Sequence, residues 1–543
     1  MTYSISLVLA GIVAVYVGLR FLLILTQSKE EPPLLKTAIP FLEPIIGIIR
    51  ERSLFYPRLR DKYNHDMYTL RLPFARIYVV NATQYIPILQ KHWRTISFTP
   101  VLAGAGPGPM GMSSEAGEIL HRDIMSDSNP VQAWSRAVTT ALHPGEGLDR
   151  LNGRAVEVMQ EMMHTLRPES QKGIPPADKE RIIDFWAWTN HAIIQTTTDA
   201  VYGPGNPFKK RDFEDAWNYW TPHYLTFALA PFKSFLAAKA LRTREFMVER
   251  WSEYFRAGWL EHASPFAQIM YNQQKSDGLS FDDLARAQVG HSHGIVATTG
   301  PTTWWLLYHI FSDPLVLSDL REELKPLVKV DDNTGESRID LADIRTKCPI
   351  LLSTFKEVMR YHSLGTQVRI CLEDEVLNGR YLLKKGGIVM IPQLVQHTSV
   401  EAWGPDAAEF RYRRFLKGDF LIGDSGQKRK PNLTAFRAFG GGHTMCPGRH
   451  FSSTEIMAFA VLMVLQFDIS PIEEGLHSPV ALSKWPIPTW RNSPMVSSFQ
   501  IPDHDFKVSV KPRDGTKWVM DFAKEKDGSG SGLEITAEDV KDN

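Results

Sequence analysis

The stretch at residues 435–450 reads Ala-Phe-Arg-Ala-Phe-Gly-Gly-Gly-His-Thr-Met-Cys-Pro-Gly-Arg-His, and it decides the fold. Three consecutive glycines before Cys446 free the backbone from ordinary steric limits, so that a flat surface can approach it closely. Pro447 and Gly448 suit a turn, and the residues from Arg449 onward predict a helix. A sulfur near a helix N-terminus meets the positive end of the helix dipole, which favours a thiolate. The pattern alone leaves Cys446 as a metal ligand, a nucleophile or a small core residue.

The spacing Phe439-x-x-Gly-x-x-x-Cys446-x-Gly448 resembles the haem-binding signature of the cytochrome P450 superfamily. The resemblance implies haem b (iron protoporphyrin IX) as the cofactor, with the Cys446 thiolate as the axial ligand of the iron. It also implies that Phe439, Gly440 and Gly448 lie around this ligand. The fold that it implies is mainly α-helical with small β-sheets.

Two further positions concern the haem propionates. The family usually has Arg or His two residues before the cysteine, whereas this chain has Thr444 there, with His443 beside it. Arg369, at the start of a predicted strand, occupies another position at which the family binds a propionate. We therefore expect Arg369 and His443 to contact the cofactor. The departure at Thr444 resembles the sterol 7α-hydroxylase branch of the superfamily.

Glu357-x-x-Arg360 lies on a predicted helix, and the spacing of three residues places both side chains on one face, where they can pair. An ordinary surface ion pair of this kind would contribute only about 0.5 kcal/mol. Downstream, Tyr412-Arg-Arg-Phe415 resembles the family's meander region. The resemblance makes Arg414 the third member of a structural Glu357–Arg360–Arg414 cluster.

Ser280 predicts the start of a long helix over Phe281–Phe311, which contains the unusual segment Gly294-Ile-Val-Ala-Thr-Thr-Gly-Pro301. Proline inside a helix costs about 3 kcal/mol, so we expect a bend near Pro301. The segment resembles the family's distal helix, which makes Thr298 the catalytic, proton-relaying threonine. Ala297 stands where the family has an acid, and Gly294 and Ala297 are candidates for the substrate pocket. The Gly-Pro pair is similar to sterol 7α- and 8-hydroxylases and prostacyclin synthase.

The composition excludes several classes of protein. The chain has 543 residues with 61 basic and 61 acidic side chains, which argues against a nucleic-acid-binding protein. Apolar residues make up 43%, as in a packed globular protein. Three cysteines cannot form a disulfide framework, so nothing in the sequence requires an oxidising compartment.

Ile5–Leu25 is apolar except for Arg20, and about 21 helical residues match the thickness of a bilayer core. Basic residues follow this stretch and none precedes it within the chain, so the positive-inside rule predicts that the rest of the protein faces the cytosol. A cleaved signal peptide is the alternative. The predicted organisation is a membrane anchor (1–28), a proline-rich hinge (29–49), a catalytic domain (50–523) and a flexible C-terminal tail (524–543).

Most other segments of the chain read as helices, and a few short runs read as strands. The predicted helices include Lys239–Leu260 and Asp340–Tyr361, and the predicted strands are Met67–Leu72, Ile77–Val80, Val368–Ile370 and Ile388–Ile391. The basic run Gln427–Lys430, together with Arg437, is either a solvated loop or part of a face that docks an acidic flavoprotein.

Taken together, these features predict a haem-thiolate monooxygenase in the endoplasmic reticulum membrane, single-pass, with its catalytic domain in the cytosol. It would use O2 and electrons from NADPH–cytochrome P450 reductase, with cytochrome b5 as an additional donor. The residues after Cys446-Pro-Gly resemble fungal microsomal members. This predicts a lipophilic substrate, a terpenoid, steroid or polyketide intermediate of secondary metabolism. The alternatives are a peroxide isomerase or dehydratase on the same fold, and a haem-binding membrane protein without turnover.

Overall fold

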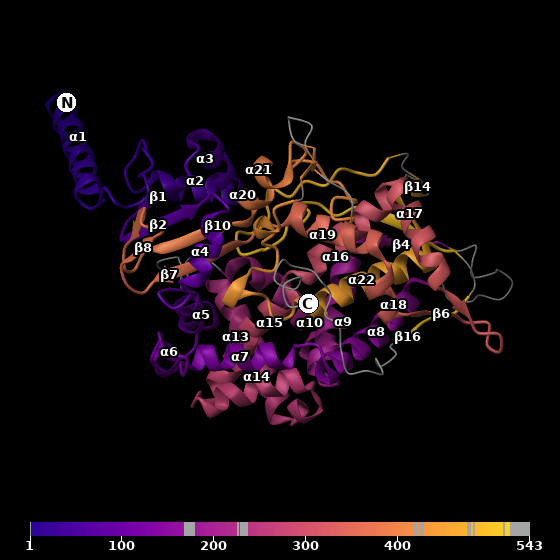
Figure 1. The fold of residues 1–543 in the computed structure, drawn as a ribbon. Coiled ribbons are helices and arrows are strands. Elements are labelled where there is room, and N and C mark those ends of the chain that lie inside the picture. Colours follow the sequence, from indigo (N-terminus) through magenta and orange to yellow (C-terminus); the bar gives the residue numbers. More distant parts are fainter. Residues whose placement is uncertain are drawn as a thin grey trace.

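The computed structural model describes residues 2–167, 180–224, 227, 237–417, 421–422, 428–429, 431–474, 479–481, 484–513 and 516–521. Figure 1 shows a mainly helical molecule with the largest sheet near one end and helix α1 projecting from that end. This confirms the predicted fold class, mainly α with small β-sheets. The predicted tail at 524–543 lies outside the described residues.

The helices differ greatly in length. Their bounds are α1 Thr2–Leu25, α2 Glu43–Glu51, α3 Phe55–Tyr63, α4 Tyr85–Lys91, α5 Thr99–Ala105, α6 Ser114–His121, α7 Pro130–Ala141, α8 Glu146–Leu166, α9 Phe185–Tyr202, α10 Arg211–Trp220, α13 Ala238–Arg256, α14 Pro265–Ser276, α15 Phe281–Val296, α16 Thr299–Ser312, α17 Pro314–Leu324, α18 Leu341–Lys347, α19 Pro349–His362, α20 Gln393–His397, α21 Val400–Trp403 and α22 Arg449–Gln466.

The strands form small, separate sheets. The largest has the order β1 (Met67–Leu72), β2 (Ala75–Val80), β10 (Ile388–Pro392), β7 (Thr366–Cys371) and β3 (Ile96–Ser97). A second has the order β14 (Pro479–Ala481), β13 (Phe467–Glu474), β15 (Lys507–Pro512) and β4 (Arg181–Asp184), and a third the order β16 (Trp518–Asp521), β6 (Ser337–Asp340) and β5 (Lys329–Val330). Two hairpins pair β8 (Glu375–Leu377) with β9 (Tyr381–Leu383) and β11 (Leu421–Ile422) with β12 (Lys428–Arg429).

The five-stranded sheet buries side chains on both faces. Along β2, Ile77 and Val79 belong to one apolar cluster, and Tyr78 and Val80 belong to another. This follows from the period of two in a strand, which sends neighbouring side chains to opposite faces. Since β7 is an inner strand of this sheet, Arg369 is held on a rigid and buried element.

Helix α22 passes through the core of the helical part. Every residue from Ser453 to Gln466 is buried, and the helix begins at Arg449, as predicted. Because a helix that is apolar on all sides must be surrounded by protein, α22 is fixed from every direction. The loop that carries Cys446 is therefore anchored to a deeply buried helix, and Cys446 lies two residues before its N-cap at Gly448.

The predicted helix Phe281–Phe311 is two helices, α15 and α16, which meet at Ala297 and Thr298. The prediction of a bend near Pro301 is confirmed, because the break falls at Ala297, whose carbonyl Pro301 cannot bind. Pro301 lies in the first turn of α16, where a missing N–H is tolerated because that group has no helical partner. A Cβ on Gly300 would lie 2.3 Å from Oδ1 of Asn190, so the close approach of α9 requires glycine here.

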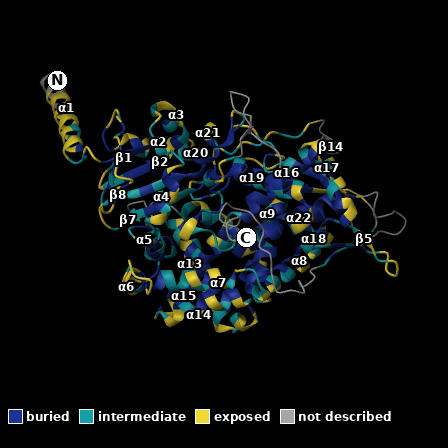
Figure 2. Cartoon of the chain, viewed as in Figure 1, coloured by how far each residue is buried: buried dark blue, intermediate teal, exposed yellow. Residues whose placement is uncertain are grey.

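The N-terminal segment forms the long helix α1, which Figure 1 shows projecting from the body, and Figure 2 shows it largely exposed. Within the described residues, no helix is long and apolar enough to span a bilayer, so the prediction of a membrane-spanning helix within 1–28 lacks support. In the predicted hinge, the N–H of Thr69 donates to the carbonyl of Pro33 at 2.8 Å. Helix α2 crosses the predicted boundary at residue 50.

Two histidines join α16 to α19, of which His362 is buried and His309 is partly buried. His309 and His362 share a hydrogen bond of 2.8 Å between their Nε2 atoms, and Nδ1 of His362 lies 2.6 Å from Oε1 of Gln500. An amide oxygen only accepts, so Nδ1–H of His362 donates to Gln500 and Nε2–H of His309 donates to His362. Burial lowers the pKa of His309 to about 3 and holds the pKa of His362 well below its usual range. Both rings are therefore neutral at physiological pH.

These pKa values predict that the protein loses stability in mild acid. Below pH 6.5 these histidines bind protons in the unfolded chain but stay neutral in the folded protein. The free energy of unfolding therefore falls as the pH falls. At pH 5.5 one such histidine lowers the free energy of unfolding by about 1.4 kcal/mol. His309→Gln keeps a donor toward His362 but does not titrate. Urea unfolding at pH 7.5 and 5.5 should show a pH-dependent loss smaller by about 1.4 kcal/mol in this variant than in the wild type.

The matched control is His504→Gln, since His504 is exposed and its ring meets water in both states. It should leave the pH dependence unchanged. Equal pH dependence in the wild type and His309→Gln would contradict a neutral His309 in the folded protein.

Candidate functional site

The loop before α22 is folded tightly around Cys446. Its backbone N–H donates to the carbonyl of Phe439 at 2.8 Å, which closes the loop, and Phe439 is buried. Gly440 has a φ of +80°, and a Cβ there would lie 2.4 Å from the carbonyl oxygen of Thr444. Glycine is therefore required at this turn. The sequence predicted a loop that a flat group can approach, and the structure supplies the turn that forms it.

The cysteines differ in their surroundings. Cys348 and Cys371 are buried, and burial raises the pKa of each thiol to about 12, so both are inert core residues. Cys446 is half-buried. Burial also raises the pKa of its thiol, but the backbone N–H of Gly448 and the positive charge of Arg449 act in the opposite direction. Cys446 is thus the one cysteine of the chain that combines partial exposure with groups that favour a thiolate.

Arg369 and Thr444 line a cavity beside the cysteine loop. Nη2 of Arg369 donates to Oγ1 of Thr444 at 2.8 Å, whereas its Nη1 is buried without a hydrogen-bond partner. His443 lines the same cavity and stacks on Trp93, with ring centroids 4.0 Å apart. The structure therefore brings Arg369, His443 and Thr444 together, and adds Trp93, which no sequence signal marked because it lies far away in the chain.

Arg437 was expected on a solvated or docking face, and this expectation was wrong. Its side chain is 1% exposed, and a Cβ on Gly441 would lie 1.7 Å from its Nη2. Burial, followed by the positive charge of Arg437, lowers the pKa of Arg369 to about 10. Two guanidinium groups are therefore buried near each other behind the cysteine loop, and the second was missed because a basic residue in a loop gives no sign of its burial.

The junction of α15 and α16 presents a small, polar patch. Gly294, Ala297 and Thr298 follow the i, i+3, i+4 spacing of one helix face, and all three are at least partly exposed. A Cβ on Gly294 would meet no atom of the described residues within 4 Å. Thr298 is the N-cap residue of α16, but its hydroxyl makes no capping hydrogen bond. This hydroxyl is therefore left available to another group.

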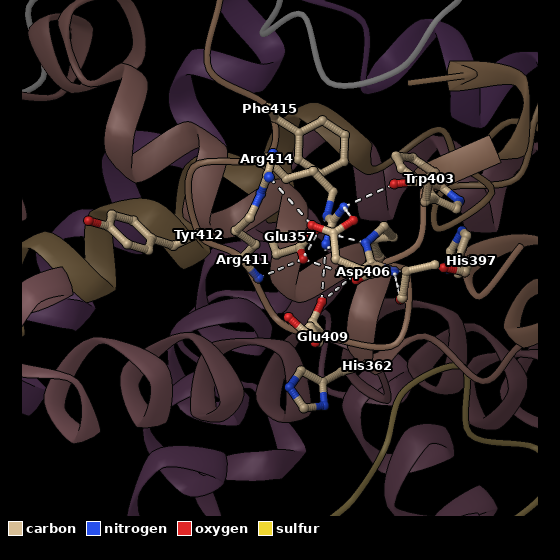
Figure 3. Close-up of polar contacts among 12 residues, drawn as sticks. Glu357, His362, His397, Trp403, Asp406, Glu409, Arg411, Tyr412, Arg414 and Phe415 are labelled. Carbon is tan, nitrogen blue, oxygen red and sulfur yellow. Dashed lines mark hydrogen bonds and ion pairs between the residues drawn. The ribbon is translucent and has the colours of Figure 1, made fainter. Parts of the chain in front are cut away.

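Glu357, Arg360 and Arg414 form a buried cluster. Figure 3 shows Glu357 and Arg414 facing each other within it. Both carboxylate oxygens of Glu357 accept from Arg360 at 2.8 Å, and Oε1 also accepts from Nε of Arg414 at 3.1 Å. All three side chains are fully buried. The surface ion pair considered from the sequence is therefore excluded. Further N–H groups of Arg360 donate to the backbone carbonyls of His397, Ala407 and Glu409, and Nη1 of Arg414 donates to Oδ1 of Asp406 at 2.8 Å.

Comparison with known proteins identifies the family. Residues 32–482 match the family model for cytochrome P450, and the chain belongs to this family. It is 30% identical over 518 residues to the cytochrome P450 monooxygenase nodJ of Hypoxylon pulicicidum, covering 92% of this chain and 95% of that protein. It is 24% identical to the 7-alpha-hydroxycholest-4-en-3-one 12-alpha-hydroxylase of Oryctolagus cuniculus, and the alignment covers 89% of this chain and 94% of that protein. The solved structure of retinoic acid-bound cyanobacterial CYP120A1 superposes with a TM-score of 0.64 at 16% identity, covering 90% of this chain and all of that chain.

The protein is thus a cytochrome P450 monooxygenase, and its cofactor is haem with a thiolate ligand. The residues present fit this cofactor. Cys446 offers a half-buried sulfur, and Arg369 offers a buried cation whose Nη1 has no partner in the described structure. Because a buried charge without a partner is costly, an anionic group such as a haem propionate is the expected complement.

The buried cluster gives a stability prediction. Glu357→Gln removes the charge that two buried guanidinium groups share, so the free energy of unfolding should fall by about 3–5 kcal/mol. The control is Glu157→Gln, because Glu157 pairs with Arg154 at the same spacing and the same 2.8 Å but is 63% exposed. The control should change stability by less than about 1 kcal/mol. Urea unfolding measures both, and equal losses would show that burial of the cluster does not govern its contribution.

Proposed function

We propose that this cytochrome P450 oxidises a lipophilic intermediate of secondary metabolism, of the terpenoid, steroid or polyketide class. Dioxygen is the oxidant, and NADPH–cytochrome P450 reductase supplies the electrons, with cytochrome b5 as a second donor. The proposal is supported by similarity to a fungal monooxygenase over nearly the whole length of both chains. The structural observation that carries it is the combination of a half-buried thiol at Cys446 with the unpartnered, buried Nη1 of Arg369.

When bound, the haem supplies the activation of dioxygen and the transfer of one oxygen atom to the substrate. Cys446 would bind the iron as a thiolate, with the N–H of Gly448 stabilising the negative charge on the sulfur. Arg369 and His443 would hold a propionate at the cavity that they line. The open face at Gly294 and Ala297 would admit substrate, because neither side chain fills the space in front of the helix.

Thr298 would deliver protons. Its hydroxyl oxygen can accept a proton from water and pass its own proton onward, which is the role that an available hydroxyl at a helix junction can take. Ala297 has no carboxyl group, so water is the proton source beside Thr298. The alternative of a peroxide isomerase would need no such relay and no reductase. Product formation from a lipid hydroperoxide without NADPH would favour the isomerase, and oxygen-dependent NADPH use favours the monooxygenase.

The ligand assignment predicts the spectrum of the reduced CO complex. The wild type should show the red-shifted Soret band of thiolate-ligated haem, and Cys446→Ala should lose it, because no sulfur remains to bind the iron. Cys348→Ala is the control, since Cys348 is buried with a raised thiol pKa and should leave the band in place. A normal red-shifted band in Cys446→Ala would overturn the assignment.

The proton relay predicts that loss of the Thr298 hydroxyl uncouples NADPH consumption from product formation. Thr298→Ala should continue to consume NADPH but release hydrogen peroxide, with product per NADPH falling about tenfold, because general acid–base groups contribute at least this factor. Thr298→Ser keeps the hydroxyl and should retain coupling. The measurement compares NADPH consumed, product and peroxide in one reaction. Unchanged coupling in Thr298→Ala would place the relay elsewhere.

The proposal includes attachment to the endoplasmic reticulum membrane through residues 1–28, with the catalytic domain in the cytosol. It is supported by exposed apolar side chains on α1, among them Ile12, Val13 and Phe21. Exposed apolar area of this kind favours transfer into lipid by about 25 cal/mol per Å2.

Membrane attachment predicts how substitutions change fractionation. The variant Ile12→Asp with Val13→Asp should move from the membrane pellet to the supernatant after a carbonate wash, because a carboxylate near the bilayer centre is costly. Val330→Asp, at an exposed apolar position on β5, is the control and should remain in the membrane pellet, like the wild type. Retention of the double variant in the pellet would refute attachment through α1.

A further inference from the structure

The cavity at Arg369 contains an unusual arrangement for a buried cation. The Arg369 side chain is 3% exposed, and no carboxylate among the described residues pairs with it. Its Nη1 has no hydrogen-bond partner, and its Nη2 donates only to Thr444. The neighbouring Arg437 adds a second positive charge, which together with burial lowers the pKa of Arg369. A guanidinium in such surroundings is turned toward a ligand that is itself negative.

Thr444 fixes the direction in which this guanidinium points. Its Oγ1 accepts from Nη2 of Arg369 at 2.8 Å and donates to the carbonyl of Gly441 at 3.0 Å. The hydroxyl thus uses its hydrogen on the loop backbone and a lone pair on Arg369, so its rotation is settled. Nη2 of the planar guanidinium is thereby held by the loop, while Nη1 stays buried without a partner in a residue that lines the cavity.

We propose that Thr444 is a positioning residue that orients Arg369 toward a haem propionate, in place of a direct cation at position 444. The inference rests on the proposed function for its cofactor. Thr444 does not touch the iron ligand's sulfur, and it carries no charge, so it acts only through the direction of the Arg369 side chain.

The test uses Thr444→Val, which keeps the shape but removes the hydroxyl, in the full-length holoprotein. Haem transfer to excess apomyoglobin should become about five- to tenfold faster, as expected for the loss of one intramolecular hydrogen bond of average net strength. The reduction potential of the iron should become more negative, because a positive charge near the cofactor stabilises the reduced form. Thr444→Ser keeps the hydroxyl and should behave as the wild type in both measurements.

A double-variant cycle shows whether Thr444 acts through Arg369. In an Arg369→Lys background, which lacks the planar fork, Thr444→Val should change haem transfer less than twofold. The same five- to tenfold acceleration in both backgrounds, or none in either, would overturn the inference. If Thr444→Val yields no holoprotein, Thr444→Ala is measured in its place under the same criteria. Loss of the red-shifted CO band in the wild type would instead refute the proposed function, so the two failures are distinguishable.

Discussion

Two buried guanidinium groups share the carboxylate of Glu357, and the path of the chain toward Cys446 depends on that sharing. Arg360 is bidentate on Glu357 and also donates to the carbonyl of His397 at 2.7 Å. The neutral ring of His397 then accepts from the backbone N–H of Arg437 at 2.8 Å, at the start of the cysteine loop. Burial lowers the pKa of His397 to about 3, which keeps its Nε2 an acceptor. A continuous line of hydrogen bonds thus runs from the cluster to the loop.

This series of hydrogen bonds explains why the ion pairs of Glu357 are buried. Replacing a buried pair by apolar residues is often tolerated energetically, so net stability alone does not account for it. The carbonyls that Arg360 and Arg414 bind belong to an irregular segment, which has no ladder of its own to fix it. Charged donors with several N–H groups can hold such a segment in one arrangement. The cluster therefore specifies where the loop begins, while α22 specifies where it ends.

The sequence allowed prediction of those parts of the site that are local in the chain. The cysteine loop, the start of α22 and the pairing of Glu357 with Arg360 all follow from spacing within a few residues. The burial of Arg437, the stacking of Trp93 on His443 and the His309–His362 pair were not predictable in this way, because each joins segments that only the tertiary fold brings together. The helix break was predictable, because Pro301 cannot donate to the carbonyl of Ala297, the C-cap residue of α15.

The division between α15 and α16 also separates two groups of packing contacts. Both helices contact α9, but α15 also packs on α13 and on the short π-helical segment Gly106–Met110, whereas α16 packs on α19 and α22. Thr298 is the first residue of the second group, and Gly294 belongs to the first. Substitutions in α13 or in residues 106–110 can therefore change the space in front of Gly294 while the backbone of Thr298 keeps its position against the core. Such an arrangement lets substrate preference diverge between descendants of one gene without disturbing the chemistry that they share.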